Sequence, residues 1–152
     1  MFKKGDLIFI WSGGFFAWLI SFFSKVPHIA VAIDDDRYIE ADFFKGVRLV
    51  GKVNLLNSKR YEVYSIPASD QRTNQFVQTL MCKYGAEYDR TGLIAYLTGF
   101  KLFQSSKRWF CSELVAYALK RVGLQISLNA YKVSPEDIYK WIIKNSGKVY
   151  YD

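Results

Sequence analysis

The feature that most constrains the fold of this chain is a change in its hydrophobic pattern near residue 67. Before that point, short runs rich in Val, Ile, Tyr and Phe are separated by polar turns, a pattern typical of β-strands. After it, apolar residues recur at the spacing of a helix that packs one face on a core. Strands first and helices later predict an α+β fold rather than an alternating α/β fold.

The pattern also predicts the individual elements. Five strands are expected at residues 6–10, 29–33, 37–41, 46–53 and 61–66, and the second half of the chain has four expected helices, at residues 70–84, 91–97, 111–123 and 135–143. Three consecutive aspartates, at residues 34–36, indicate a tight turn between the second and third strands, which we interpret as a β-hairpin. Gly123 is a natural helix stop, and Ser134 followed by Pro135 is a helix start.

The length and composition indicate one folded domain. The chain has 152 residues, of which 51% are hydrophobic, so it can bury a sizeable core. It contains only 3 prolines and 10 glycines and has no evident repeat or low-complexity tract. These features exclude collagen-like, solenoid and disordered chains. We expect residues 1–152 to form a single domain.

The amino-terminal segment 7–24 carries no charge and follows Lys3 and Lys4, so it resembles a membrane-spanning helix or a signal peptide. Asp6, the Ser-Gly-Gly run at 12–14 and the lack of a cleavage pattern favour a strand, a glycine turn and an aromatic helix at 15–23 instead. Aromatic side chains on all faces of that helix would contact an acyl chain, a membrane surface or a partner, or be buried under a lid. Without a convincing signal peptide, we expect a cytoplasmic protein, or one released by a virus or by lysis.

Charge and cysteine content limit the partners and cofactors. The net charge of +7 favours anionic partners, but the basic residues are scattered, so nucleic acid is an unlikely partner. Two cysteines and one histidine cannot supply a structural zinc site. A disulfide between Cys82 and Cys111 is conceivable, but an apolar chain of this length has little need of one, and we interpret both thiols as reduced.

The residues that could carry chemistry are Cys111, His28 and Glu40. Cys111 opens the predicted helix 111–123, where unpaired N–H groups and the helix dipole stabilise a thiolate, although a free cysteine is more often a small buried hydrophobe. His28, the only histidine, opens a strand and could act as the general base, although a lone histidine is often incidental. Glu40 in the next strand could orient the imidazole, or could be a solvated carboxylate.

Four other polar residues have simpler interpretations. Cys82 lies near the end of a predicted helix, where the dipole does not favour a thiolate, so we expect a structural role. Glu113 suits the start of its helix as a capping residue. Tyr88 would line a cleft or belong to the core. Asp6 is expected to make hydrogen bonds within a turn or to the backbone.

Six short motifs occur along nearly the whole chain: KGDLIFI, PHIAVAID, YIEA, KYGAEYD, FCSELVAYAL and VSPEDI. In their order and spacing they resemble the NlpC-like cysteine hydrolases of the papain fold, in the circularly permuted, YiiX-like branch that is related to lecithin:retinol acyltransferase. In unpermuted relatives the cysteine helix precedes the histidine strand. Here it follows the histidine strand, which is the permuted order.

The resemblance implies a papain-like fold with a small antiparallel sheet packed against the nucleophile helix. It implies a thiolate from Cys111, a base from His28, an orienting carboxylate from Glu40, and no cofactor or metal. The substrate would be a peptide amide, such as one of the cell wall, or a lipid ester in the acyltransferase branch. A basic, aromatic module that binds a membrane or a partner without catalysis is the non-enzymatic alternative.

The spacing within the hairpin creates a difficulty for this site. If residues 34–36 close a tight, flat turn, Glu40 pairs near Val31 or Ala32. The strand rise then separates the Cα atoms of His28 and Glu40 by about 10 Å or more. On that geometry, only a strongly twisted or bulged hairpin would bring the two side chains together.

Overall fold

The computed structural model describes residues 2–11, 28–42, 44–56, 60–88, 108–109, 111–126, 133–146 and 148–149. Three sequence expectations lie outside these residues: the glycine turn at 12–14, the aromatic helix at 15–23 and the short helix at 91–97. Among the residues described, no helix is long and apolar enough to cross a membrane.

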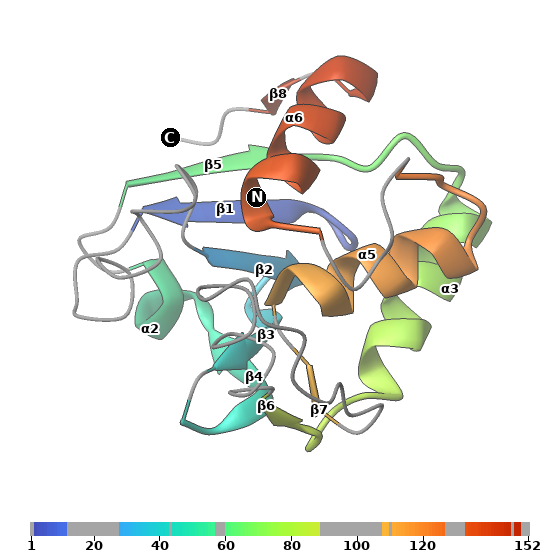
Figure 1. Ribbon diagram of the computed structural model, residues 1–152. Helices are drawn as coiled ribbons and strands as arrows, with labels where there is room; N and C mark the ends of the chain where they lie inside the picture. The colour runs from blue at the N-terminus through green and yellow to red at the C-terminus, as the bar shows by residue number, and fades with distance from the viewer. Residues whose placement is uncertain are drawn as a thin grey trace.

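A six-stranded antiparallel sheet forms the centre of the structure (Figure 1). Its strands lie in the order β4-β3-β2-β1-β5-β8. Their bounds are β1 Leu7–Trp11, β2 His28–Ala32, β3 Arg37–Asp42, β4 Gly46–Gly51, β5 Arg60–Tyr64 and β8 Lys148–Val149. A separate two-stranded parallel ribbon pairs β6, Glu87–Tyr88, with β7, Arg108–Trp109.

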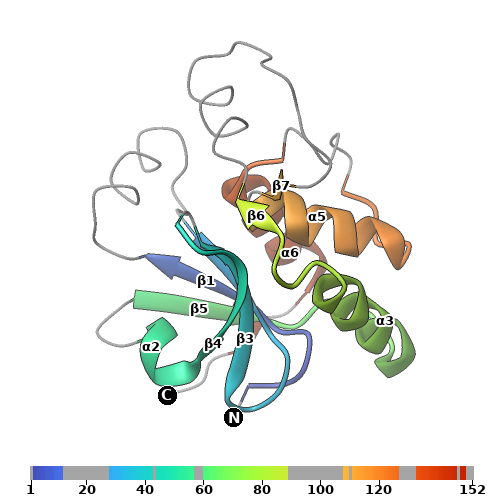
Figure 2. The ribbon, with the colours of Figure 1, turned by 90° about the horizontal axis from the view of Figure 1, so that it is seen from below.

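The helices cover the two faces of the sheet unequally. They are α2 Lys52–Leu56, α3 Asp70–Met81, α5 Cys111–Arg121 and α6 Pro135–Asn145. The last three share one buried cluster with Leu7 and Phe9 of β1, whereas α2 packs with Ile8, Ile10 and Phe2 on the opposite face. Figure 2 shows α3, α5 and α6 grouped on one side of the sheet and α2 on the other. The α+β class predicted from the sequence is confirmed.

Cover on both faces explains why successive residues of β1 are all apolar. Successive side chains of a strand point to opposite faces, so a strand covered on one side alternates between apolar and polar residues. In β1, Leu7 and Phe9 face the cluster under the long helices, and Ile8 and Ile10 face the cluster under α2. All four are essentially inaccessible to water. An apolar run of this kind is therefore a doubly covered strand.

The structure corrects several element boundaries. The strand expected at 46–53 ends at Gly51, and residues 52–56 form α2, which buries Leu55 and Leu56 against the sheet. Strand β8 and the ribbon of β6 and β7 were not predicted, because strands of two residues carry almost no periodic signal. The capping signal at α6 is confirmed: the Ser134 side chain accepts from the Asp137 N–H, and the Asp137 carboxylate accepts from the Ser134 N–H.

Gly46 is a position that only glycine fits, and its replacement should be costly. Its φ is +72°, and an added Cβ would lie 2.3 Å from the carbonyl oxygen of Ala86, which accepts a hydrogen bond from the Val47 N–H at 2.8 Å. We expect Gly46→Ala to lower the free energy of unfolding by about 2–4 kcal/mol, from backbone strain plus a clash. Urea denaturation measures this loss.

Gly85 provides the matched control, because its φ of +82° is equally unfavourable for alanine but an added Cβ meets nothing within 4 Å. Gly85→Ala should therefore cost only about 1–2 kcal/mol, the strain alone. Equal losses for the two variants would contradict the close contact between β4 and the turn at Ala86.

Candidate active site

The β2–β3 hairpin places two of the predicted site residues. Its turn is held by Asp34, whose carboxylate accepts hydrogen bonds from the backbone N–H groups of Asp36 and Arg37 and from the Arg37 side chain. The Ile33 N–H donates to the Arg37 carbonyl. The aspartate run therefore closes the hairpin as the sequence predicted, but with a wider loop than a tight turn would have.

The wider loop shifts the register, and this overturns the expected separation of His28 and Glu40. Glu40 pairs with Ala30, not with Val31 or Ala32, so it lies diagonally across from His28 on the same face of the hairpin. Diagonal neighbours in antiparallel strands are about 7–8 Å apart at Cα, within reach of long side chains. The Nε2 atom of His28 lies 2.7 Å from Oε2 of Glu40. No strand bulge is needed to bring these two side chains together.

Cys111 reaches the same place from the helical layer. It is the first residue of α5, the helix that packs on β2 and β3, and its side chain is buried. The Cys111 side chain is among the groups that raise the pKa of His28, so the thiol lies close to the imidazole. Nε2 of His28 is engaged by Glu40, which leaves Nδ1 as the ring nitrogen available to the sulfur. The structure thus brings together all three predicted site residues, which come from α5, β2 and β3.

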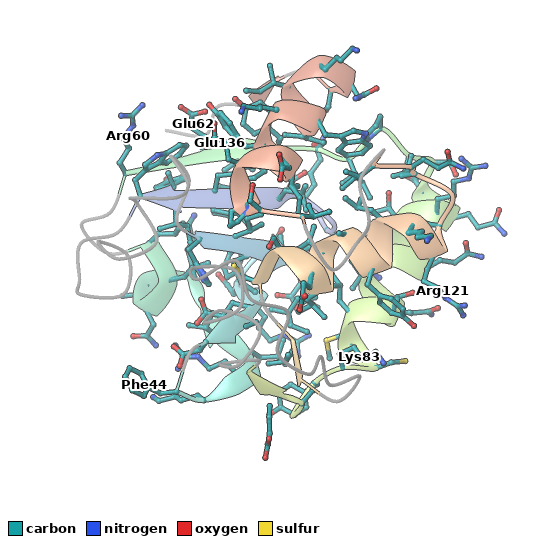
Figure 3. The ribbon with its side chains drawn as sticks, viewed as in Figure 1. Phe44, Arg60, Glu62, Lys83, Arg121 and Glu136 are labelled. Carbon is teal, nitrogen blue, oxygen red and sulfur yellow. The ribbon has the colours of Figure 1, made fainter. Side chains whose placement is uncertain are left out.

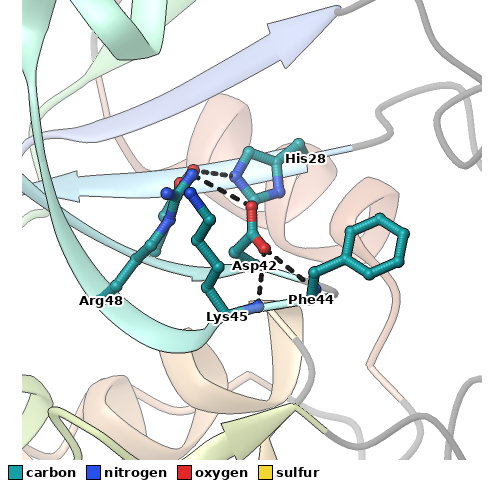
Figure 4. Close-up of polar contacts among 6 residues, drawn as sticks. His28, Asp42, Phe44, Lys45 and Arg48 are labelled. Atoms are coloured by element: carbon teal, nitrogen blue, oxygen red, sulfur yellow. Dashed lines mark hydrogen bonds and ion pairs between the residues drawn. The ribbon is translucent and has the colours of Figure 1, made fainter.

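Cys111, His28 and Glu40 form a row of side chains that continues to Arg48 and Asp42. The sequence analysis identified neither Arg48 nor Asp42 as a site residue. The Arg48 guanidinium donates to Oε1 of Glu40 from Nε at 3.0 Å and lies 2.8 Å from the same oxygen through Nη2. Nη2 also donates to Oδ2 of Asp42 at 3.0 Å. Figure 4 shows the guanidinium beside His28 and Asp42. Arg48 stands alone in an otherwise apolar strand, and only the pairing of β3 with β4 places it directly opposite Glu40.

The electrostatics favour an ionised pair. Burial alone would lower the pKa of His28, but its hydrogen bonds with Cys111 and Glu40, together with their charges, outweigh burial and raise the pKa from 6.5 to about 10. Burial tends to raise the pKa of Glu40, but the hydrogen bond and charge of His28, and then those of Arg48, lower it from 4.5 to about 2. At neutral pH the ring is therefore an imidazolium beside a carboxylate.

The start of α5 is fixed by a neighbouring loop. The Ser112 hydroxyl donates to the carbonyl oxygen of Val133 at 2.6 Å, and both residues are buried. Val133 lies directly before the N-cap residue of α6, so this bond ties the first turn of α5 to the start of α6. In the first turn of a helix the backbone N–H groups have no partner within the helix, and they can receive an oxyanion.

The remaining candidates lie away from this row. Cys82, for which we expected a structural role, is exposed at the end of α3; it and Cys111 are free thiols. Glu113 lies buried in the first turn of α5. Asp6 accepts from the Lys3 N–H, as expected, and also from the Ser65 hydroxyl. Tyr88 is in β6, and its side chain is outside the described part of the structure.

Another largely buried carboxylate of the sheet, Glu62, lies on β5, two strands away from β2. Glu62 accepts hydrogen bonds from the hydroxyl groups of Tyr64, at 2.9 Å, and Tyr139 of α6, at 2.8 Å. Figure 3 places Glu62 on the side of the sheet where α6 lies. These bonds join α6 to the sheet, so we interpret Glu62 as a structural residue.

The row from Cys111 to Asp42 has the parts of a nucleophilic site. A thiolate is a good nucleophile, an imidazole beside it can move a proton, and a carboxylate hydrogen-bonded to the ring fixes the orientation of the ring. Across the ranges that the structure describes, no three His, Cys, Asp or Glu residues are grouped as a metal site would require.

Comparison with protein-family models finds no match for this chain, and no curated protein matches it. The chemical interpretation of the site therefore rests on the residues and geometry described above.

Proposed function

We propose that this protein is a cysteine hydrolase or acyltransferase of the permuted NlpC-like, papain-like type, acting on an amide or ester through a thioester at Cys111. One observation carries the proposal: α5, β2 and β3 bring a thiol, an imidazole and a carboxylate together, and the imidazole and the carboxylate are 2.7 Å apart. The antiparallel sheet packed against the nucleophile helix is consistent with the fold that the sequence resembles.

In the acylation step, the Cys111 thiolate attacks the carbonyl carbon, and a C–S bond forms while the carbonyl π electrons move to oxygen. Backbone N–H groups at the start of α5 stabilise this oxyanion. When the intermediate collapses, the C–N or C–O bond breaks, and the His28 imidazolium gives its Nδ1 proton to the leaving amine or alcohol. The product is a thioester and a neutral imidazole, which Glu40 keeps in place.

In the second step the thioester is consumed. Neutral His28 takes a proton from water, or from an acceptor alcohol or amine, as its oxygen or nitrogen attacks the thioester carbonyl. The C–S bond breaks, and the thiolate and the imidazolium are restored. Peptide amides, including those of cell walls, are the substrates that the resemblance favours, and lipid esters are the alternative within the same fold.

Labelling of Cys111 tests the proposal. Intact-mass measurement after exposure to a panel of amide and ester activity-based probes should show one adduct, located at Cys111. Cys82→Ser, which removes the exposed thiol, should label as the wild type does, and Cys111→Ser should not label through a thioester. A panel that labels neither the wild type nor Cys82→Ser at Cys111 would instead support a non-enzymatic binding module.

We also propose a reducing, cytoplasmic location, which the two free thiols support because disulfides form readily in oxidising compartments. Thiol titration of freshly isolated protein should find both cysteines reduced. A Cys82–Cys111 disulfide would contradict both the location and the mechanism.

A further inference from the structure

The Glu40 carboxylate is shared by two cationic groups, and only one of them takes part in the proposed chemistry. Oε2 lies against Nε2 of His28, and Oε1 lies against Nε and Nη2 of Arg48. A carboxylate with only one oxygen held can still rotate about its terminal torsion, because that torsion adopts a broad range of angles. A carboxylate with both oxygens held, on opposite strands, cannot rotate.

The guanidinium is itself anchored. Nη2 of Arg48 reaches Oδ2 of Asp42, and the other Asp42 oxygen, Oδ1, accepts from the N–H groups of Phe44 and Lys45 at 2.9 Å each. Figure 4 shows these bonds around Asp42. Asp42 therefore joins the turn between β3 and β4 to Arg48. Its charge also offsets that of the guanidinium, which would otherwise oppose a positive charge on His28.

We propose that Arg48 is a positioning residue of this site: it locks the Glu40 carboxylate in the orientation that holds the His28 ring, and Asp42 anchors the guanidinium. This inference rests on the proposed function for its role in catalysis. The charged groups that the described residues bring to Glu40 are His28 from β2 and Arg48 from β4, with Asp42 from β3 acting through Arg48. Cys111 from α5 acts through His28.

The sole histidine of the chain makes a direct test practical, because the imidazole region of the proton NMR spectrum holds the signals of one ring. When Glu40 takes up a proton at low pH, the His28 signals should shift, so their low-pH inflection reports the ionisation of Glu40. In Arg48→Gln this inflection should move up by about one pH unit or more, because a paired guanidinium lowers a carboxyl pKa by that amount.

Two further variants separate charge from geometry. Arg48→Lys keeps the charge, so it should keep the inflection near the wild-type pH. A lysine lacks the planar fork that lets Arg48 bond Glu40 and Asp42 together. The rate of labelling in Arg48→Lys should therefore lie between those of Arg48→Gln and the wild type. Arg37→Gln is the matched control, because Arg37 pairs with Asp34 in the exposed turn of the same hairpin. It should change neither the inflection nor the labelling.

The labelling kinetics give the second measurement. With an acyl probe, Arg48→Gln should lower the maximal inactivation rate by about 10- to 100-fold, the cost of a small misplacement of a reacting group, and leave the probe's binding constant unchanged. Thermal unfolding of each variant confirms that rates are compared on folded protein. An unchanged inflection in Arg48→Gln, or weaker probe binding at an unchanged maximal rate, would overturn the positioning role.

The two proposals can fail separately, because the NMR titration needs no turnover. If Cys111 forms no thioester with any probe but the inflection moves as expected, Arg48 positions Glu40 and the proposed function fails. If Cys111 is acylated in the wild type and in Arg48→Gln at the same rate, the function stands and the inference about Arg48 fails.

Discussion

Replacing His28 with alanine should lower the rate at which Cys111 reacts with an acyl probe by about 10²- to 10⁴-fold, the usual contribution of a positioned general acid–base group. The imidazole is hydrogen-bonded to Glu40 and lies close to the thiol, so its loss removes the proton carrier and the positive charge beside the sulfur at once. The rate is measured by intact mass in a Cys82→Ser background, which leaves one thiol to follow.

The pH dependence of alkylation by iodoacetamide provides the matching control. In the wild type, alkylation and probe labelling both need the Cys111 thiolate beside the imidazole, so one lower pH limb should govern both reactions. In His28→Ala, alkylation should rise only near about pH 8–9, where an ordinary thiol ionises. Identical profiles for the wild type and His28→Ala would show that the two residues do not act as a catalytic pair.

Glu40→Gln is expected to reduce both stability and reactivity. The carboxylate accepts from His28 on one oxygen and from Arg48 on the other. A glutamine can accept on its oxygen only, so its NH₂ group must face one of these two donors. Breaking one partner of a buried ion pair costs about 3–5 kcal/mol, and because a third of the Arg48 side chain remains exposed we expect about 1–3 kcal/mol here.

The loss of unfolding free energy in Glu40→Gln should depend on pH, and the two pKa shifts fix the direction of that dependence. The pKa of Glu40 is lowered, so its stabilisation is complete above its ordinary value of 4.5 and is lost as the pH falls toward 2. The pKa of His28 is raised, so its stabilisation is complete below 6.5 and is lost as the pH rises toward 10. The difference in unfolding free energy between wild type and Glu40→Gln should therefore be largest between pH 4.5 and 6.5.

Glu62→Gln is the matched variant for this experiment. Glu62 is also a largely buried sheet carboxylate, but it lies on β5, where it accepts from the hydroxyl groups of Tyr64 and Tyr139 and has Arg60 at 3.7 Å. Its substitution should lower stability without changing the reactivity of Cys111. A loss of reactivity equal to that of Glu40→Gln would mean that the effect of Glu40 on Cys111 is only a consequence of reduced stability.

Much of the fold was predictable because its elements are long enough to show a period. The sequence predicts strands β1 to β3 and helices α3, α5 and α6, and each predicted bound lies within a few residues of the observed one. Helix α2 was misread as the end of a strand, because its short apolar segment KVNLL looks the same in either state. Its conformation is decided by the second core cluster, where Leu55 and Leu56 meet Phe2, and sequence spacing does not reveal that contact.

The site was predictable in its members but not in its geometry. Residue chemistry and helix position indicated Cys111, His28 and Glu40, and the structure brings their side chains together. The predicted separation of His28 and Glu40 depended on the length of the hairpin loop. The assumption of a tight turn was wrong, because Glu40 pairs with Ala30. Arg48 was missed because a lone arginine in a strand has no pattern of its own. Only the pairing of β3 with β4 reveals its role.

The order of the parts along the chain has a consequence for synthesis. His28, Glu40, Asp42 and Arg48 all belong to one local three-stranded meander, β2 to β4, whereas Cys111 comes with α5, much later in the chain. Contacts between near neighbours in the sequence close at a lower entropic cost than distant ones. We therefore expect the side chains around Glu40 to lie in a part of the sheet that can pair early during synthesis, and the proposed site to be complete only once α5 docks on the sheet.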